Sequence, residues 1–367
     1  MSNFADKLNK LKTLLVKASE HRSYVRQIYE IIQHKVVINV NPLDYYRHEF
    51  YKNGETLEQK SRYVILGGSR YWPFENNAFK FAVTLNNKYI QKTLLKGFGL
   101  PTPEVLTTIG IDYDIKDRDQ LENFLGENQR DIVFKPISSA QGKNILVVTK
   151  RDNQYFLGEQ PITYDDIWNH VKRDMKNGYL FEEKVVNHSS IADINPSCLN
   201  TSRVITIKTN DNKWHIAVCI AKFGRAGSFV DNASAGGIVL WPDNMGKIID
   251  AYDFLTREPI IHHPDTGARL TGIELAGYQQ VNELALQASE KFCFMGAIGW
   301  DIAYTDNGAM IIEGNSISGV DKIQIGKGGM IGDEIAKGLK RHYMLGRWDK
   351  TKMYPGYWRK PWWSRKK

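Results

Sequence analysis

Three oxygen-bearing side chains, Asp301, Glu313 and Asn315, fall within the segment GWDIAYTDNGAMIIEGN at residues 299–315. Two runs rich in β-forming residues flank the triplet Asp-Asn-Gly at 306–308, which predicts a hairpin with a three-residue loop and its glycine in the left-handed conformation. In that register Asp301 pairs with Glu313. Asn315 shares the face of Glu313 because residues two apart on a strand point the same way. The three side chains are therefore expected to converge.

Two carboxylates that face each other across a hairpin repel unless a cation lies between them. Carboxylate and amide oxygens suit Mg²⁺, which completes its shell with phosphate and water. A solvated polar face without a ligand is the alternative, but the apolar residues at 302–303 and 311–312 favour a buried hairpin, and buried carboxylates need partners. The strand register decides between the two interpretations. A two-residue loop at Asn307-Gly308 would put Asp301 opposite Gly314 and move it away from Glu313 and Asn315.

A second chemistry-bearing segment is VFKPISSAQGKN at residues 133–144. Lys135 ends an apolar run, and Ser138, Ser139 and Gly142 follow it. Hydroxyls, glycine-exposed amides and ammonium groups are suited to wrapping nucleotide phosphates. The segment is not a Walker A loop, because GxxxxGK[ST] is absent. A surface turn between two strands remains the alternative interpretation.

The elements that must position these residues follow from periodicity and from turn signals. Apolar periodicity predicts helices over 1–35 and over 281–292. A further helix is predicted over 86–99, with an Asn cap at its start and a Gly at its end. Another begins at a capping box formed by Thr163 and Asp166, and its apolar face extends to Met175. Strands are predicted on both sides of the 138–142 loop, over 179–186, 202–209 and 214–223, and in the hairpin. This mixture indicates an α+β architecture.

Composition excludes several classes of protein. The chain has 367 residues, 42% of them hydrophobic, so intrinsic disorder is excluded as a description of the whole. The longest apolar run, at 292–300, is far shorter than a membrane-spanning helix, and the N-terminus has no signal-peptide pattern. The three scattered cysteines favour a reducing, cytoplasmic location over a disulfide framework.

The formal net charge of +8 is concentrated at one end. From Arg341 to Lys367 there are nine Lys/Arg and one acid, together with four of the nine tryptophans. Interleaved Trp and Lys/Arg suit a membrane surface, here the inner face of the membrane, and would also suit an acidic glycan. A solvated tail whose tryptophans pack on the body is the other reading. No nucleic acid is expected as a partner, because no nucleic-acid motif appears elsewhere.

Taken in order, these pieces resemble the ATP-grasp superfamily. More narrowly, the segments NTSRVITI, FVDNASAGGI, HPDTG and GWDIAY…IIEGN look like those of the sugar-transfer-associated ATP-grasp proteins of polysaccharide gene clusters. The resemblance runs from about 41 to 340. It implies an ATP-grasp fold in which two α+β subdomains, 86–180 and 181–345, grip ATP. A helical and mixed N-terminal region, 1–85, precedes them, and a basic Trp-rich tail, 346–367, follows.

The resemblance also implies roles for single residues. Lys135 matches the lysine at the α/β-phosphates, Lys88 matches a second phosphate lysine, and Ser138, Ser139 and Gly142 lie in the phosphate lid. Four residues match the hinge strand whose backbone reads adenine: Glu182, Glu183, Lys184 and Val185. Asp193 matches a residue at the ribose, and Arg203 matches a basic residue at the transferred phosphoryl group, with Lys222 and Arg225 as helpers. The magnesium ligands of the family are matched by Asp301, Glu313 and Asn315.

The implied activity is that of an ADP-forming carboxylate–amine ligase that works through an acyl phosphate with ATP and Mg²⁺. Its substrates would be a small-molecule carboxylate and an amine, one of them sugar-linked, as in an amide between an amino acid and a sugar acid of a cell-surface polysaccharide. A phosphotransferase on the same scaffold and a non-catalytic nucleotide-binding partner of a glycosyltransferase are the alternatives. His262-His263 is interpreted as loop structure rather than a metal site.

Overall fold

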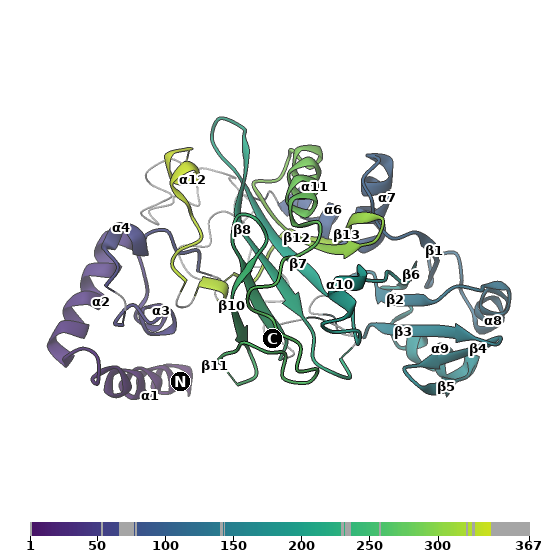
Figure 1. Ribbon diagram of the computed structural model, residues 1–367, viewed down its shortest axis with the longest axis horizontal. Coiled ribbons are helices and arrows are strands. Elements are labelled where there is room, and N and C mark those ends of the chain that lie inside the picture. The colour runs from purple at the N-terminus through teal and green to yellow at the C-terminus, as the bar shows by residue number, and fades with distance from the viewer. Residues whose placement is uncertain are drawn as a thin grey trace.

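The computed structural model describes residues 2–52, 54–65, 77, 79–139, 142, 144–228, 231, 236–256, 258–320, 322–324 and 327–338. The predicted basic tail and its membrane contact lie outside these residues. Helices and two antiparallel sheets occur together, as Figure 1 shows, so the α+β prediction is confirmed. Within the described residues, each helix is too short or too polar to span a bilayer.

The first sheet has six strands in the order β1-β6-β2-β3-β4-β5. They are β1 (Val105–Ile109), β2 (Ile132–Pro136), β3 (Leu146–Arg151), β4 (Gln154–Leu157), β5 (Gln160–Ile162) and β6 (Tyr179–Glu183). Helices α8 (Arg118–Glu127) and α9 (Tyr164–Val171) share one apolar core with this sheet. Because β6 extends to Glu183, the predicted division between residues 180 and 181 falls inside a strand of this sheet.

The capping box predicted for the helix at Thr163 is present. The Thr163 hydroxyl accepts from the Asp166 N–H, and the Asp166 carboxylate accepts from the Thr163 N–H. The helix is shorter than predicted, because a 3₁₀ turn (Lys172–Asp174) follows Val171 and Met175 lies beyond it. Gly178, with a φ of +74°, then turns the chain into β6. Met175 still packs against the same core.

The second sheet has seven strands in the order β11-β10-β9-β8-β7-β12-β13. They are β7 (Thr201–Lys208), β8 (Trp214–Phe223), β9 (Ile238–Pro242), β10 (Ile248–Asp253), β11 (Glu258–Pro259), β12 (Ala297–Thr305) and β13 (Gly308–Asn315). Helix α11 (Tyr278–Lys291) covers one face, and its predicted apolar positions are buried. Short helix α10 (Ser189–Ala192) lies on the connection between the two sheets.

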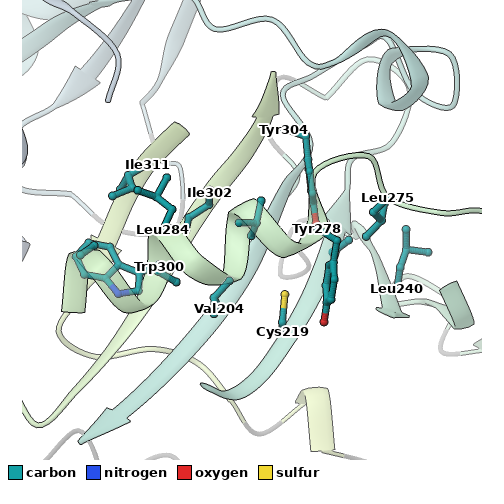
Figure 2. Close-up of a cluster of buried hydrophobic side chains, with 14 of the residues drawn as sticks. Val204, Cys219, Leu240, Leu275, Tyr278, Leu284, Trp300, Ile302, Tyr304 and Ile311 are labelled. Atoms are coloured by element: carbon teal, nitrogen blue, oxygen red, sulfur yellow. The ribbon is translucent and has the colours of Figure 1, made fainter. Parts of the chain in front are cut away.

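The core under α11 determines which side chains of the sheet face the opposite way. Figure 2 shows Trp300, Ile302 and Tyr304 of β12 in the cluster with Leu284 of α11. Side chains alternate along a strand, so Asp301 must point to the other face. The same alternation applies to β7 and β8, where Val204 and the pair Ala221 and Phe223 belong to this core. Arg203 and Lys222 are thereby directed to the face that carries Asp301.

That opposite face is only partly covered. A second apolar cluster packs residues such as Ile205 and Ile220 of the sheet against Val320, Ile323 and Ile331 of the C-terminal segment. That segment contains the 3₁₀ turn Lys322–Gln324 and helix α12 (Asp333–Gly338). The part of the face that carries the charged side chains lies beyond this cover, so it is available to a ligand.

The N-terminal helices form a unit with its own core. They are α1 (Ser2–Ala18), α2 (Tyr24–Ile38), α3 (Pro42–Arg47) and α4 (Leu57–Lys60), and α1 and α2 confirm the helical prediction for 1–35. Their buried cluster is rich in tyrosine and includes Tyr45, Tyr46, Phe50 and Tyr63. In Figure 1 these helices lie at the end of the molecule far from the first sheet. We call residues 2–65 the N-terminal unit.

Helices α6 (Phe79–Asn86) and α7 (Lys88–Gly97) lead into the first sheet. The predicted cap of α7 is confirmed, because the Asn87 side chain accepts from the Ile90 N–H at 3.0 Å. The predicted stop is confirmed as well: α7 ends at Gly97, and Gly99 has a φ of +70°. Lys88 thus begins a helix whose start is fixed by a side-chain hydrogen bond.

The loop of the β12–β13 hairpin is shorter than predicted. It holds two residues, 306–307, and Gly308 pairs with Thr305 instead of standing in the loop. The Thr305 hydroxyl donates to the Gly308 carbonyl at 2.7 Å and accepts from the backbone N–H of residue 307, which closes the shorter turn. Gly308 keeps the predicted positive φ, at +102°.

A β-bulge restores the predicted pairing farther along the hairpin. Ile302 pairs with Ile311, and continuing this register would set Asp301 opposite Ile312. The register shifts by one residue between Ile302 and Asp301, so that Asp301 pairs with Glu313. A bulge adds one residue to one strand without ending the pairing, and it re-aims the side chains beyond it. The predicted Asp301–Glu313 pair is therefore correct, although the loop prediction was wrong.

Candidate functional site

A cleft of about 620 Å³ is lined by residues of both sheets and of the connection between them. This volume is in the range of small-molecule sites. Most of the predicted site residues line it. They are Lys88, Lys135, Gly142, Glu182, Glu183, Lys184, Val185, Arg203, Lys222, Asp301, Glu313 and Asn315. The cleft is therefore where the sequence predictions meet.

A charge cluster at the second sheet centres on Asp301. The Arg203 guanidinium donates to both oxygens of this carboxylate, from Nε to Oδ1 at 2.7 Å and from Nη2 to Oδ2 at 3.0 Å. The Lys222 ammonium lies 3.0 Å from Oδ1. Burial on its own would raise the pKa of Asp301, but these two cations outweigh it and lower the pKa to about 2. Asp301 is thus ionised and holds both cations in place.

Asp231 lies on the far side of Lys222 and was not predicted. Its carboxylate accepts from the Thr201 N–H at 2.9 Å and from the Thr201 hydroxyl, and it lies 3.3 Å from the Lys222 Nζ. Burial raises the pKa of this carboxyl more than Lys222 lowers it. Its sequence signal is the segment FVDNASAGGI, which contains Asp231 and is one of those that carry the family resemblance.

Glu313 has weaker attachments than Asp301. The Lys88 Nζ lies 3.4 Å from its Oε1, and the same ammonium donates to the Ser139 carbonyl at 2.7 Å. The Glu313 side chain is 30% exposed, whereas that of Asp301 is 12% exposed. Lys88 therefore joins the loop of the first sheet to the hairpin of the second across the cleft.

A buried ion triad lies on the first-sheet side of the cleft. The Lys135 Nζ is 2.5 Å from Glu182 Oε2, and the Lys92 Nζ is 3.1 Å from Oε1. Burial on its own would raise the pKa of Glu182, but the two ammonium groups hold it below its usual value. Burial lowers the pKa of Lys92 to about 8 even beside this carboxylate. Lys92 was missed in the sequence, although its spacing of four from Lys88 puts both on one face of α7.

Most of the predicted hinge residues have backbone groups that already pair with neighbouring segments. Glu182 lies in the middle of the ladder, paired with Val105 and Val133. The N–H groups of Glu183 and Lys184 donate to the carbonyls of the neighbouring segments. Val185 is the first of the predicted hinge residues beyond this pairing, and a role of its backbone at adenine stays a prediction.

Several predicted residues lie apart from the cleft or on its margin. Asp193 is exposed at the end of α10 and is not among the described cleft-lining residues. Arg225 is held by Asp253 and Asp265, both 2.8 Å away, in the loop region beyond β8. Arg225 is also absent from the described lining of the cleft, so its role as a helper at the phosphoryl group stays a prediction.

The lid residues are described only in part. Ser138 is exposed, and the Ser139 hydroxyl turns back toward the Pro136 carbonyl at 3.4 Å. Gly142 has a φ of +68°, the conformation that glycine adopts most readily. Neither serine is among the described cleft-lining residues, so their phosphate role stays a prediction.

His263 confirms the interpretation of the histidine pair as loop structure. Its Nε2 lies 3.0 Å from the Gly224 carbonyl, and its Nδ1 accepts from the N–H groups of Asp265 and Thr266. The ring is 1% exposed and organises the HPDTG turn. Both nitrogens are occupied by backbone groups, which excludes a metal-ligand role.

The oxygen set of the hairpin fits a magnesium ion in its chemistry. Asp301 and Glu313 are paired across the strands, Asn315 follows Glu313 by two, and all three line the cleft. The Asn315 amide nitrogen donates to the Gly299 carbonyl, which leaves its oxygen for a ligand. No cluster of three or more His, Cys, Asp or Glu suited to a metal occurs among the described residues, because the third member here is an amide. Mg²⁺ accepts such a mixed oxygen set together with phosphate oxygens.

Similar folds occur among solved structures. They include an ADP complex of N5-carboxyaminoimidazole ribonucleotide synthetase (12% identity, TM-score 0.44, 72% of this chain and 54% of that one). A biotin carboxylase from Campylobacter jejuni in complex with a β-γ-ATP compound (13%, 0.44, 72% and 46%) and D-alanine–D-alanine ligase from Bacillus anthracis (15%, 0.36, 64% and 58%) are further examples. The chain spans about half the length of these proteins.

A comparison with curated proteins gave no significant match. A family model described as sugar-transfer associated ATP-grasp matches residues 69–337, which is more than two thirds of the chain and contains both sheets and the cleft. The N-terminal unit precedes the matched residues. The resemblance inferred from the motifs is thereby confirmed: the chain belongs to the sugar-transfer associated ATP-grasp family.

Proposed function

We propose that the protein is an ADP-forming, ATP-dependent carboxylate–amine ligase that joins an amino acid to a sugar acid in cell-surface polysaccharide biosynthesis. One observation carries the proposal. Four cations that suit phosphates, Lys88, Lys135, Arg203 and Lys222, line the same cleft as the oxygen set of the hairpin. Membership of the ATP-grasp family implies that the nucleotide is ATP. Catalysis of phosphoryl transfer depends mainly on positioning the phosphates and neutralising their charge, and the cations and oxygen ligands of this cleft can do both.

The cations are held by carboxylates that do not react. Asp301 fixes the Arg203 guanidinium through two hydrogen bonds, and Arg203 Nη1 also donates to the Ser318 hydroxyl at 2.6 Å. A guanidinium held in this way meets the charge that develops on the transferred phosphoryl group without reorganising. Glu182 holds Lys135 in the same manner. We assign Arg203 and Lys135 to the phosphoryl group and to the preceding phosphates, respectively.

Glu313 and Asn315 would hold Mg²⁺, beside Asp301 whose two oxygens accept from Arg203, and the ion would supply Lewis-acid neutralisation of the terminal phosphates when bound. Lys88 is the chain's own cation at this point, because it lies 3.4 Å from Glu313. On binding of ATP its ammonium is free to turn from that carboxylate toward a phosphate oxygen. The loop after β2, to which Lys88 is bonded, would then close over the phosphates and keep water out.

The reaction balances in two displacements. A substrate carboxylate oxygen bonds to the γ-phosphorus, the bond to the β–γ bridging oxygen breaks, and ADP leaves. The amine nitrogen then bonds to the acyl carbon, phosphate leaves, and the nitrogen loses a proton. The amide is therefore formed with one ATP converted to ADP and phosphate.

The test is ADP release with pairs of amino acids and uronic acids, followed by the mass of the product. Ligation predicts a product lighter than the sum of its substrates by one water. A product heavier by a phosphate group would establish a phosphotransferase instead, and absence of ADP release with all pairs would contradict an enzyme of this class.

The variant Glu313→Gln locates the activity in the cleft. Turnover should fall about 100-fold or more, because the carboxylate that would hold Mg²⁺ against the terminal phosphates is lost. The fold should survive, since Glu313 is partly exposed and has one ion pair. Glu290→Gln, the same change at an exposed position of α11, is the matched control and should leave turnover unchanged. Wild-type turnover in Glu313→Gln would remove the metal assignment.

A further inference from the structure

Helix α2 presents its apolar side chains outward. Its buried positions are mostly polar: Gln27, Glu30, His34 and Ile38. Five of its large apolar residues are exposed by half or more of their surface, namely Val25 (80%), Ile28 (52%), Tyr29 (54%), Ile32 (59%) and Val36 (67%). An ordinary surface helix has the reverse arrangement, with apolar residues toward the core.

The exposed residues form one continuous stripe. Their spacings of three, one, three and four place them along a single side of a helix. At 100° per residue this side lies opposite the buried one. We call Val25, Ile28, Tyr29, Ile32 and Val36 the outer stripe. A contiguous apolar surface of this kind marks a site of interaction more often than scattered exposed residues do.

The buried polar side is internally satisfied, so the helix is not simply packed the wrong way round. Gln27 donates to the Arg22 carbonyl at 2.7 Å and accepts from the Tyr46 hydroxyl at 2.9 Å. Glu30 accepts from the Tyr45 hydroxyl at 2.7 Å and from Arg26 Nε at 2.8 Å. Rotating the helix to bury the stripe would break this network, and the stripe must therefore find its cover outside the chain's described part.

Positive charge surrounds the outer stripe. Residues 2–38 hold seven Lys/Arg and three Asp/Glu, a local net of +4, and one of the acids, Glu30, is buried. On α2 itself, Arg26 lies on one flank of the stripe and Lys35 on the other, and both are exposed. The stripe has no exposed acid on its own helix. Apolar residues flanked by cations and containing a tyrosine suit the interface of an anionic bilayer.

We propose that the outer stripe docks the protein on the surface of an anionic phospholipid bilayer. The stripe would enter the headgroup region, with Lys35 at the phosphates and with Arg26, which keeps its bond from Nε to Glu30, beside them. The N-terminal unit that carries it lies outside the family match and, in Figure 1, at the far end of the molecule from the first sheet. The described lining of the cleft contains no residue of this unit.

A second copy of the chain fits the stripe less well. The helix has 15 residues and is therefore about 22 Å long and about 10 Å wide. The surface area that one side of such a helix can bury is far below the roughly 800 Å² per partner of a stable interface. Cations on both flanks would also face each other in a pair of copies. A bilayer needs no matching area and offers the opposite charge.

The test uses the full chain and sedimentation with vesicles. We expect binding to vesicles of phosphatidylcholine with 30% phosphatidylglycerol, at least tenfold weaker binding to pure phosphatidylcholine, and weaker binding at high salt. Ile32→Glu and, separately, Val36→Glu should each reduce binding to the anionic vesicles by about tenfold or more. Ile249→Glu, at an exposed isoleucine of β10 that is 64% exposed, is the matched control and should bind as the wild type does.

Two readouts make the result decisive. Circular dichroism and ADP release without vesicles should be unchanged in each variant, which separates docking from folding and from the proposed activity. Binding that persists in both stripe variants would assign it to another segment such as the basic tail, and would overturn the proposal. A wild type that does not bind vesicles but is a dimer, and that becomes monomeric in Ile32→Glu, would overturn it in favour of a second copy.

Discussion

The N-terminal unit and the cleft both bury ionisable side chains, but they satisfy them differently. In the N-terminal unit, Glu30 is held by the neutral hydroxyl of Tyr45 and by Arg26, whose side chain is 61% exposed. In the cleft, the Glu182 side chain is 1% exposed, and its partner Lys92 is 2% exposed. A charge whose partner reaches water is a structural feature that tolerates change. A charge whose partners are all buried cannot be removed without leaving those partners buried and unpaired, which is energetically costly. A site that must hold cations in place for a ligand requires this arrangement.

The largest expected difference between the two regions comes from removing one charge in each. Glu182→Gln leaves Lys92 buried without a counter-charge, so the free energy of unfolding should fall by about 3–5 kcal/mol. Glu30→Gln leaves Arg26 free to enter water, and the loss should be about 1 kcal/mol. Urea denaturation of both variants measures the two values. Equal losses would show that burial of the partner does not govern the cost.

Acid should loosen the two regions at different pH. Burial lowers the pKa of His48, in the N-terminal unit, to about 4. Its neutral form is therefore the stable one when folded, and stability is lost as the pH falls from about 6.5 to 4. For Asp301 the two cations lower the pKa to about 2, so its contribution is present above about pH 4 and is lost between pH 4 and 2. The shifts correspond to about 3 and 2 kcal/mol, respectively.

Hydrogen exchange, corrected for intrinsic rates, can follow this order. Protection of α3 should decline between pH 6.5 and 4, while that of β7 and β12 persists until lower pH. In His48→Phe, which places another ring beside Phe50 and Tyr63, the first decline should disappear. Simultaneous loss of protection in both regions would argue against separate buried charges as the cause.

The smallest effect is expected at the start of α7. Asn87→Ala removes the cap that accepts from the Ile90 N–H, which should lower the free energy of unfolding by about 1 kcal/mol. Because Lys88 follows this cap directly, the KM for ATP should rise while the circular dichroism spectrum stays unchanged. Thr163→Ala removes the cap of α9, which is remote from Lys88, and is the control that should affect stability alone.

Elements with strong local signals were predicted well. The caps at Asn87 and Thr163 are where the sequence placed them, because a side chain that bonds to a backbone N–H three residues on is a local event. The predicted β-rich runs became strands for the same reason, namely β2, β3, β6, β7, β8, β12 and β13, whereas the other strands of the two sheets were not predicted. The hairpin loop was predicted with one residue too many, since Thr305 closes a shorter turn through its own hydroxyl.

Long-range partners were not predictable in this way. Lys92 and Glu182 are 90 positions apart, and Arg203 and Asp301 are nearly 100 apart, so no local pattern connects them. Arg225 and Asp193 were expected at the site on resemblance alone, and neither is among the described residues that line the cleft. The apolar periodicity of 1–35 predicted a helical region, and only the packing of the tyrosine cluster reveals that the outer stripe of α2 faces outward.

The sequence by itself determined several helices and strands, the family and the oxygen set of the hairpin, because each depends on neighbours within a few positions or on motifs in a fixed order. The tertiary structure decided which cations meet which carboxylates, how a bulge corrects the hairpin register, and which side of α2 is exposed. These depend on contacts between distant segments, where burial and charge pairing outweigh the preference of any single stretch of chain.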